Sequence, residues 1–196
     1  MNLPLILASA SPRRQSLLAL LRPDFTVVPA EVAEADWAHL TPAELCQLNA
    51  HLKARAVAKH HPDALVLGAD TEVCLGSRVF GKPASLAEAQ TMLAALAGRT
   101  HEVITGVCLL HRRAHREVLF AERTRVTFHP LDAAQIRDYL ARIQPLDKAG
   151  AYAIQESGEL IVERIEGSFT NVVGLPLGRL REALEQWGRP SDERAG

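Results

Sequence analysis

Three features of the sequence predict an α/β fold. Short apolar runs that suit buried strands alternate with segments that open on helix-capping residues. In the second half, two strand-like segments are joined by a polar turn, which is typical of an antiparallel hairpin. The chain has 196 residues, of which 47% are hydrophobic, so it can bury a sizeable core. We therefore expect an α/β protein with antiparallel hairpins in its second half.

Two buried strands and two capped helices are expected in the first half. Each strand is a short apolar run, and each helix opens on a hydroxyl side chain followed by proline, at Ser11-Pro12 and at Thr41-Pro42. Glu44 completes a capping box with Thr41. The strands are expected at 3–8 and 64–69, and the helices from 12 through 21 and from 42 to about 60.

The second half should add three helices and two strand pairs. Ser85 with Glu88 and Asp132 with Gln135 open two of the helices, and Gly98 is a suitable left-handed stop for the first of them. The helices are expected at 86–97, from 133 to about 142 and at roughly 175–187, and the strand pairs at 102–110 with 117–128 and at 151–155 with 160–165. Residues 1–188 then form a single domain, and residues 189–196 are expected to be a loose tail.

Composition excludes several classes of protein. The formal net charge of -1 argues against broad electrostatic binding to nucleic acid or to anionic lipid. The three cysteines are odd in number and widely spaced, so neither a disulfide framework nor a zinc site is expected. The apolar run at the N-terminus lacks a basic flank, and no stretch approaches membrane-spanning length. We expect a soluble, unprocessed cytoplasmic protein that binds neither nucleic acid nor membrane.

The residues after the first expected strand indicate a candidate anion-binding site. Ser9, Ser11, Arg13 and Arg14 place two hydroxyls and two guanidiniums around one helix N-terminus. Free N–H groups and the helix dipole favour negative charge there, and a guanidinium matches phosphate oxygens in fork geometry. A capped helix with a solvated first turn is the alternative. However, cations are normally disfavoured at a helix N-terminus, so two adjacent arginines favour a compensating anion.

Carboxylates, a threonine and a lysine are further candidate residues of a functional site. Asp70 follows a buried strand, where open α/β sheets place their ligand crevices, although an aspartate there can also simply cap a turn. Thr71 beside it could bond a base or a phosphate. Glu34 stands in a loop and could be a ligand or merely solvated, as could Glu31. Lys53 lies in the second helix and would, taken alone, be a surface residue.

Residues 76–83 nearly match the sequence of a phosphate-binding loop but lack features that the function of that loop requires. That motif ends in a hydroxyl residue that binds magnesium and leads into a helix, whereas Pro83 has no hydroxyl and Val79-Phe80 is typical of a strand. Lys82 remains as a cation after a turn glycine. A dinucleotide-dependent oxidoreductase is also disfavoured, because a glycine-rich turn is missing after the first strand.

Several separated motifs, in the same order, resemble the Maf family over nearly the whole chain. They are Ala8 to Arg14, Lys53-Ala54, Leu67 to Thr71, Gly81-Lys82-Pro83, His101-Glu102-Val103, Asp147 to Gln155, Gly167-Ser168 and Asn171 to Pro176. The sequence departs from the family pattern at two places. Ala33 stands where an acidic pair is usual, which leaves Glu34, and Leu48-Asn49 stands where Arg-Leu is common.

The resemblance implies a mixed sheet with flanking helices in two lobes around a central cleft, related to the inosine triphosphate pyrophosphatases. It further implies a frequently dimeric enzyme that hydrolyses nucleoside triphosphates to monophosphate and pyrophosphate, with Asp70 as proton acceptor. Arg13, Thr71 and Gln155 resemble the branch that acts on dTTP and UTP. The branch acting on 7-methyl-GTP, and a nucleotide-binding regulator of septum formation with little turnover, are the alternatives.

The candidate residues together suggest one mechanism for hydrolysis of a nucleoside triphosphate. A triphosphate carries about four negative charges, so its cleavage requires mainly positioning and charge neutralisation. We expect basic side chains to surround the phosphates, two carboxylates to hold Mg²⁺ or Mn²⁺, and Thr71 with Gln155 to contact the pyrimidine base. The basic residues are Arg13, Arg14, Lys53 and Lys82, and the carboxylates are Asp70 and Glu34.

Overall fold

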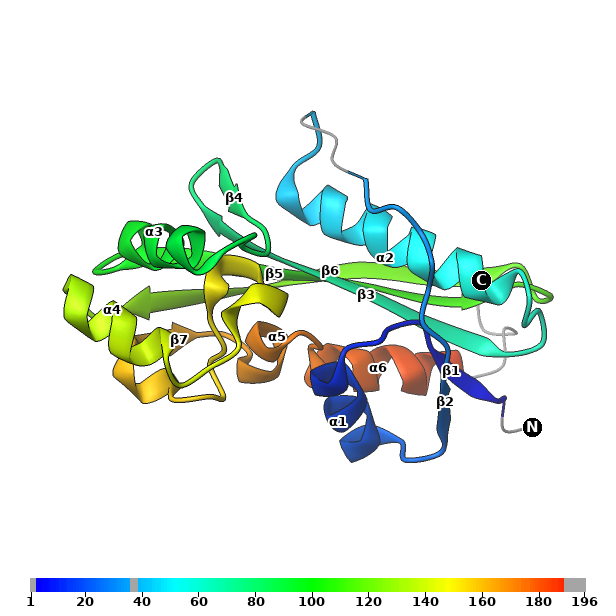
Figure 1. Ribbon diagram of the computed structural model, residues 1–196. Coiled ribbons are helices and arrows are strands. Elements are labelled where there is room, and N and C mark those ends of the chain that lie inside the picture. Colours follow the sequence, from blue (N-terminus) through cyan, green and yellow to red (C-terminus); the bar gives the residue numbers. More distant parts are fainter. Residues whose placement is uncertain (1–2, 36–38, 189–196) are drawn as a thin grey trace.

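The computed structural model describes residues 3–35 and 39–188, and these fold around a mixed sheet of seven strands (Figure 1). The strands are β1 (Leu5–Leu7), β2 (Phe25–Val27), β3 (Leu65–Leu75), β4 (Arg78–Phe80), β5 (Thr100–His111), β6 (Arg116–Phe128) and β7 (Val162–Glu166). Their order is β2-β1-β3-β5-β6-β7, and β4 pairs with β3. Only the pairs of β1 with β2 and β3 are parallel within the described sheet. The expected α/β fold is confirmed.

Helices cover both faces of this sheet. They are α1 (Pro12–Leu21), α2 (Pro42–Ala58), α3 (Leu86–Leu96), α4 (Ala133–Leu140), α5 (Phe169–Val173) and α6 (Leu177–Trp187), with the short 3-10 turns η1 (Pro145–Asp147), η2 (Ala149–Ala151) and η3 (Gly158–Leu160). Figure 1 shows α2 on one face of the long strands and α1 with α6 on the other, while α3 and α4 lie together at the far end. Two lobes of the molecule are thereby joined by β3, β5 and β6.

The expected helix starts are confirmed by their caps. The Thr41 hydroxyl accepts the Glu44 N–H at 3.3 Å, and the Glu44 carboxylate accepts the Thr41 N–H at 2.8 Å. The same reciprocal pair forms between Asp132 and Gln135 at α4. These caps satisfy N–H groups that no helical carbonyl can reach, which fixes where each helix begins.

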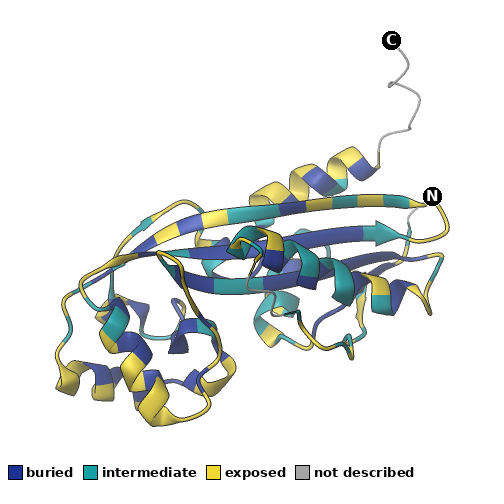
Figure 2. Cartoon of the chain, turned by 90° about the horizontal axis from the view of Figure 1, so that it is seen from above, coloured by how far each residue is buried: buried dark blue, intermediate teal, exposed yellow. Residues whose placement is uncertain are grey.

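Buried side chains form separate clusters at the two ends of the sheet. Figure 2 marks the buried residues along the strands and helices in dark blue. Around α3 and α4 the cluster is built on Phe80, Leu93 and Tyr139, each at most 1% exposed. Beneath α1 and α6 it contains Leu67 and Leu180, both fully buried. Because each end buries its own apolar surface, the polar groups of the middle can face the space between them.

Helix α2 lies unusually close to the sheet at two glycines. A Cβ added to Gly106 would lie 2.3 Å from the backbone carbonyl of Cys46, and one added to Gly68 would lie 2.2 Å from the carbonyl oxygen of Ala50. Both distances are far inside van der Waals contact, so only glycine permits this approach. The side chains that α2 directs along β3 are therefore held at a fixed height above the strand.

One predicted strand pair is wrong. Residues 151–155 form η2 and turns rather than a strand, and the strand expected at 160–165 is β7, which pairs with β6. The backbone of Gly150 and Ala151 has positive φ, and the Tyr139 hydroxyl bonds both the N–H and the carbonyl of Ala153. A side chain thus replaces the strand neighbour that the apolar run 151–154 suggested.

Other differences concern boundaries and short elements. Strand β3 runs to Leu75, well past the expected end, because β5 supplies a continuous antiparallel partner over this length. The short elements β2 and α5 had no expected counterpart. The expected loose tail, 189–196, lies outside the described residues. Among the residues described, the three cysteines are free and no helix has the length and apolar character needed to cross a membrane.

Candidate active site

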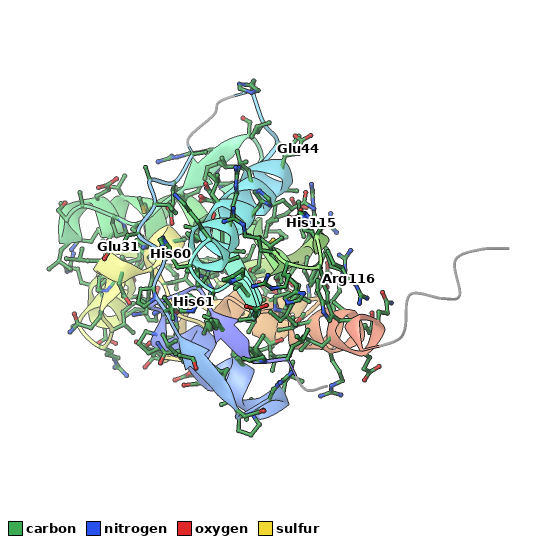
Figure 3. The ribbon with its side chains drawn as sticks, turned by 90° about the vertical axis from the view of Figure 1, so that its right-hand side faces the viewer. Glu31, Glu44, His60, His61, His115 and Arg116 are labelled. Atoms are coloured by element: carbon green, nitrogen blue, oxygen red, sulfur yellow. The ribbon has the colours of Figure 1, made fainter. Side chains whose placement is uncertain are left out.

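A cleft of about 660 Å³ opens between the two lobes. Its walls come from the start of α1, from α2, from the middle of β3 and from the segment 147–155. Ten of the residues singled out in the sequence line it, namely Ser9, Ser11, Arg13, Arg14, Glu34, Lys53, Asp70, Thr71, Lys82 and Gln155. Glu31, labelled in Figure 3, is exposed and is not among the lining residues. The roles predicted for the ten residues stay predictions, but their convergence in space is a property of the fold.

A lysine between two carboxylates forms the centre of the cleft. The Nζ of Lys53 lies 2.6 Å from Oδ1 of Asp70 and 2.6 Å from Oε1 of Glu34. The side chains of Lys53 and Asp70 are only 13% and 8% exposed, whereas that of Glu34 is 53% exposed. Since a buried charge is costly without a partner, the lysine and the aspartate depend on each other. Glu34 completes the group from the solvent side.

Asn49 connects this centre to the loop that carries Glu34. Its amide nitrogen donates to Oδ2 of Asp70 at 3.4 Å and to the carbonyl of Ala35 at 3.3 Å. Its amide oxygen accepts the Ala35 N–H at 2.7 Å. Asn49 is 2% exposed and lies one helical turn before Lys53 on α2. The departure from the family pattern at this position therefore supplies an amide that holds the Asp70 carboxylate and the backbone next to Glu34.

The expected cap of α1 is present next to the cleft. The Ser11 side chain accepts the N–H of Arg14 at 3.4 Å, and the Ser9 hydroxyl accepts the N–H of Ser11 at 3.2 Å. Both hydroxyls line the cleft, so the helix N-terminus opens onto it. Its N–H groups and dipole favour an anion there, as expected from the sequence.

Arg14 is bound to protein acceptors rather than extended into the cleft. Its Nε donates to the carbonyl of Gly174 at 2.9 Å, and its terminal nitrogens donate to the hydroxyls of Thr71 at 3.0 Å and Ser9 at 3.4 Å. Burial lowers the pKa of the guanidinium, although an arginine remains protonated in water at neutral pH. Arg14 thus ties α1 to β3 and to the segment after α5.

Thr71 lines the cleft and belongs to a chain of hydroxyls that leads away from it into the protein. Its Oγ1 accepts from Arg14 and lies 3.0 Å from Oγ1 of Thr105, whose hydroxyl donates to the carbonyl of Asn171 at 3.1 Å. The Thr105 hydrogen is thereby used, which leaves Thr71 as donor toward its remaining neighbours. The orientation of Thr71 is therefore set by Arg14 and Thr105 before any ligand enters.

Asp147 and Lys148 are site residues for which the sequence predicted no role. Nζ of Lys148 donates to the Asp147 carboxylate at 2.9 Å and to the carbonyl of Gln144 at 2.7 Å. The other oxygen of Asp147 accepts from Arg13 at 3.1 Å, across the cleft. Lys148 is 4% exposed and lines the cleft, so it adds a buried positive charge. The motif Asp147 to Gln155 contained both residues, but only contacts across the cleft reveal their use.

Lys82 and Gln155 lie at the open side of the cleft. Both are exposed and line it. The carbonyl of Gly81 accepts the N–H of Gly150 at 3.0 Å, which ties the turn before Lys82 to the segment that leads to Gln155. Lys82 is thereby available to a ligand's anionic part, and Gln155 offers both a donor and an acceptor.

The cleft also has the oxygen donors that a hard divalent cation requires. The carboxylates of Asp70 and Glu34 face one another across the ammonium group of Lys53. The two carboxylates thus already share one cationic group. Mg²⁺ and Mn²⁺ prefer such oxygen ligands and complete their coordination shell with water and phosphate oxygens. Taken together, the cleft combines carboxylates with five basic side chains, an arrangement suited to a polyanion and to water chemistry on it.

Comparison with known proteins gives a consistent result. A family model described as Maf-like protein matches residues 4–187. A protein of Moorella thermoacetica named dTTP/UTP pyrophosphatase is 51% identical over 190 residues, covering 94% of this chain and 98% of its own. A protein of Bacillus cytotoxicus with the same name is 48% identical over 182 residues, covering 93% and 94%.

Two solved structures share the fold at low sequence identity. The Ham1 protein of Staphylococcus aureus has a TM-score of 0.56 at 16% identity, covering 94% of this chain and 99% of its own. A Ham1 protein of Coxiella burnetii has a TM-score of 0.57 at 16% identity, covering 94% and 100%. At this identity the likeness concerns the fold alone.

Proposed function

Since this chain belongs to the Maf family, we propose that it hydrolyses dTTP and UTP to the nucleoside monophosphate and pyrophosphate. The observation that carries the proposal is the pairing of Lys53 with Asp70 and Glu34 inside a cleft that four further basic side chains line. These side chains are Arg13, Arg14, Lys82 and Lys148. A nucleoside triphosphate supplies the charge that such a cleft is built to neutralise.

Hydrolysis adds water across the α–β phosphoanhydride bond. Asp70 orients the attacking water and accepts its proton on a carboxylate oxygen, while the bridging oxygen leaves with one of the two products. Lys53, held 2.6 Å from Asp70, keeps this carboxylate in place and lies close to the developing negative charge. Arg13, Lys82 and Lys148 neutralise the phosphate oxygens from the other walls of the cleft.

Arg14 acts in this scheme as a positioning residue. Its hydrogen bonds to Thr71 and to the carbonyl of Gly174 hold two walls of the cleft together. Asn49 acts in the same way on Asp70 and on the loop that carries Glu34. The groups that touch substrate therefore need little reorganisation when the nucleotide binds.

Asp70 and Glu34 would hold the divalent cation. When bound, Mg²⁺ or Mn²⁺ supplies charge neutralisation at the phosphates and lowers the pKa of a coordinated water. The ammonium group of Lys53 lies between the same two carboxylates, so it would have to give up part of this contact to the metal.

Recognition of the base is assigned to Gln155 and Thr71, with Arg13 assisting. Gln155 can donate and accept toward a pyrimidine edge, and the Thr71 hydroxyl is oriented by Arg14 and Thr105. A polar pocket of this kind rejects analogues that leave its groups unpaired. The expected homodimer and the cytoplasmic location stay predictions.

A substrate screen tests this function. Purified protein is incubated with dTTP, UTP, CTP, GTP, ATP, 7-methyl-GTP and modified pyrimidine triphosphates, and pyrophosphate release is measured with Mg²⁺, with Mn²⁺ and with a chelator. We expect the fastest release from dTTP and UTP, and loss of release on chelation. Binding without turnover would identify a nucleotide-binding regulator instead, and a preference for 7-methyl-GTP would place the chain in the other branch.

A further inference from the structure

A second cluster of metal-ligating side chains lies between α2 and the β5–β6 hairpin. His51 comes from α2, Cys108 from β5 and Glu117 from β6, so three elements converge on it. One ligand atom from each side chain lies within 4.8 Å of the other two. In residues 3–35 and 39–188 this is the one group of three or more such side chains that is close enough to share an ion.

The contacts inside the cluster converge on a single oxygen. Nδ1 of His51 lies 2.5 Å from Oε1 of Glu117, and the thiol of Cys108 donates to the same oxygen at 3.3 Å. Ligand atoms around one tetrahedral ion are roughly 3.5 Å apart, given metal–ligand distances of about 2.0–2.3 Å. The side chains of His51 and Glu117 are 28% and 36% exposed, so they can separate by the small amount required.

The cluster is distinct from the cleft. Residues two apart on a helix point to nearly opposite flanks, and Lys53 on α2 reaches Asp70 whereas His51 reaches Glu117. The cluster residues are not among those that line the cleft. The two sites nevertheless share α2, whose height above the sheet is fixed at Gly68 and Gly106.

From this geometry we propose, in contrast to the sequence expectation that the cysteines form no zinc site, that His51, Cys108 and Glu117 form a second metal site, which takes Zn²⁺ or a similar borderline-soft ion. One imidazole, one thiolate and one carboxylate make a three-ligand set that Zn²⁺ accepts, with water as the fourth ligand. Mg²⁺ prefers oxygen ligands to nitrogen and sulfur, so the site selects against Mg²⁺. Cys108 releases its thiol proton to solvent when the ion binds.

Occupation of this site links α2 to both strands of the hairpin. The cluster joins α2 to a hairpin that is far from it in sequence, and an ion that binds only the folded chain stabilises it by mass action. Since α2 also carries Lys53 and Asn49, the ion fixes the helix that presents them to Asp70.

Titration with Co²⁺ tests the proposal, because a thiolate bound to Co²⁺ gives a charge-transfer absorption band that oxygen ligands in the cleft cannot give. We expect one equivalent of Co²⁺ to produce the band and Zn²⁺ to abolish it. Asp70→Asn protein should retain the band, as should Cys74→Ser, which changes another buried cysteine. Cys108→Ser should lose it.

Because Cys108 is buried, its replacement can also impair folding, so variants of the two partly exposed ligands provide a second test. His51→Gln and Glu117→Gln should each weaken Co²⁺ binding at least as much as the about 10- to 100-fold cost of an outer-shell change. Zn²⁺ should raise the thermal unfolding temperature of the unsubstituted protein and raise that of His51→Gln much less. The absence of a charge-transfer band, or a band that persists in Cys108→Ser, would overturn the proposal.

Discussion

The ammonium group of Lys53 on α2 lies 2.6 Å from the carboxylate of Asp70 on β3. Both side chains are largely buried, so removal of either one leaves an uncompensated charge at the centre of the cleft. The contact depends on how closely α2 approaches the sheet, which two glycines permit. Lys53 also contacts Glu34, so the same amino group neutralises both proposed metal ligands.

Replacement of Lys53 by Met should have opposite effects on turnover and on metal binding. Turnover of dTTP should fall by about 100-fold or more, because a cation near the reacting phosphates is lost. Mn²⁺ should bind more tightly in the absence of nucleotide, since no amino group occupies the space between Asp70 and Glu34. Steady-state kinetics and Mn²⁺ titration followed by electron paramagnetic resonance measure the two effects. Lys59→Met, at an exposed position after α2, is the control, and weaker Mn²⁺ binding in Lys53→Met would contradict the interpretation.

Gly106→Ala should displace α2 from the sheet. The new methyl group would lie 2.3 Å from the Cys46 backbone, and relief of such a clash typically costs about 1–3 kcal/mol. Urea denaturation should show this loss of stability, and turnover should fall because Lys53 moves away from Asp70. Gly178→Ala, where a Cβ meets no atom within 4 Å, should leave both properties unchanged. A fully stable and active Gly106→Ala protein would refute the proposed close contact.

Arg14→Lys should destabilise the protein more than Arg13→Lys does. Lysine cannot reproduce the fork that reaches Gly174 and Thr71 together, and leaving these acceptors unpaired should cost about 1–3 kcal/mol. Arg13 forms an ion pair with Asp147 and its side chain is 23% exposed, so its replacement should cost less stability. Chemical denaturation of both variants provides the comparison, and equal losses would argue against the positioning role of Arg14.

Gln155→Ala should relax base preference before it reduces catalysis. The exposed side chain lines the cleft and takes no part in the Lys53–Asp70 ion pair, so its loss removes the proposed base contacts and not the reacting groups. The ratio of kcat/KM for dTTP to that for a purine triphosphate should fall by about tenfold. Gln144→Ala, which removes an exposed glutamine side chain at the start of η1, is the matched control. An unchanged ratio would place base recognition elsewhere.

His101 should make the fold sensitive to acid. Burial lowers the pKa of its imidazole from 6.5 to about 4, and Nε2 is paired with the Tyr152 hydroxyl at 2.9 Å. Below pH 6.5 the His101 imidazole therefore binds a proton in the unfolded chain but not in the folded chain. The free energy of unfolding decreases as the pH falls from 6.5 toward 4. This difference amounts to at most about 3 kcal/mol.

The contribution of His101 is isolated by comparison of variants. His101→Gln should reduce the fall in unfolding free energy between pH 6.5 and 4, whereas His60→Gln, at an exposed position, should leave it unchanged. Urea denaturation across this pH range is the measurement. Equal pH dependence in the two variants would show that His101 does not remain neutral in the fold.

Local chemistry made much of the fold predictable. The reciprocal caps at Thr41 and Asp132 fix helix starts through contacts within four residues, so their sequence signals are sufficient. Residues 151–155 were misassigned because an apolar run does not reveal that Tyr139 supplies the hydrogen bonds of Ala153. A partner 14 residues away leaves no periodic signal.

In the candidate site, too, the residues placed by local structure could be predicted, whereas those placed by distant contacts could not. The residues around Ser11 could be found because they stand at the start of a helix, where anions bind. Asp70 was found from the apolar run before it, although it lies within β3 and not at a strand end as the sequence predicted. The use of Asp147 depends on Arg13 from the opposite wall of the cleft, and the engagement of Arg14 depends on Gly174. Such pairs are separated by more than one hundred residues, and only the folded chain brings them together.

Product analysis with and without the Asp70 carboxylate tests the central claim most directly. Purified protein and its Asp70→Asn variant are incubated with dTTP and Mg²⁺, and the products are separated by ion-exchange chromatography, with Asp138→Asn on α4 as a control. We predict dTMP and pyrophosphate from the unsubstituted protein and from the control, and a loss of about a thousandfold or more in Asp70→Asn, beyond any loss of folded protein that thermal unfolding shows. Formation of dTDP and phosphate, or undiminished turnover by Asp70→Asn, would contradict the account.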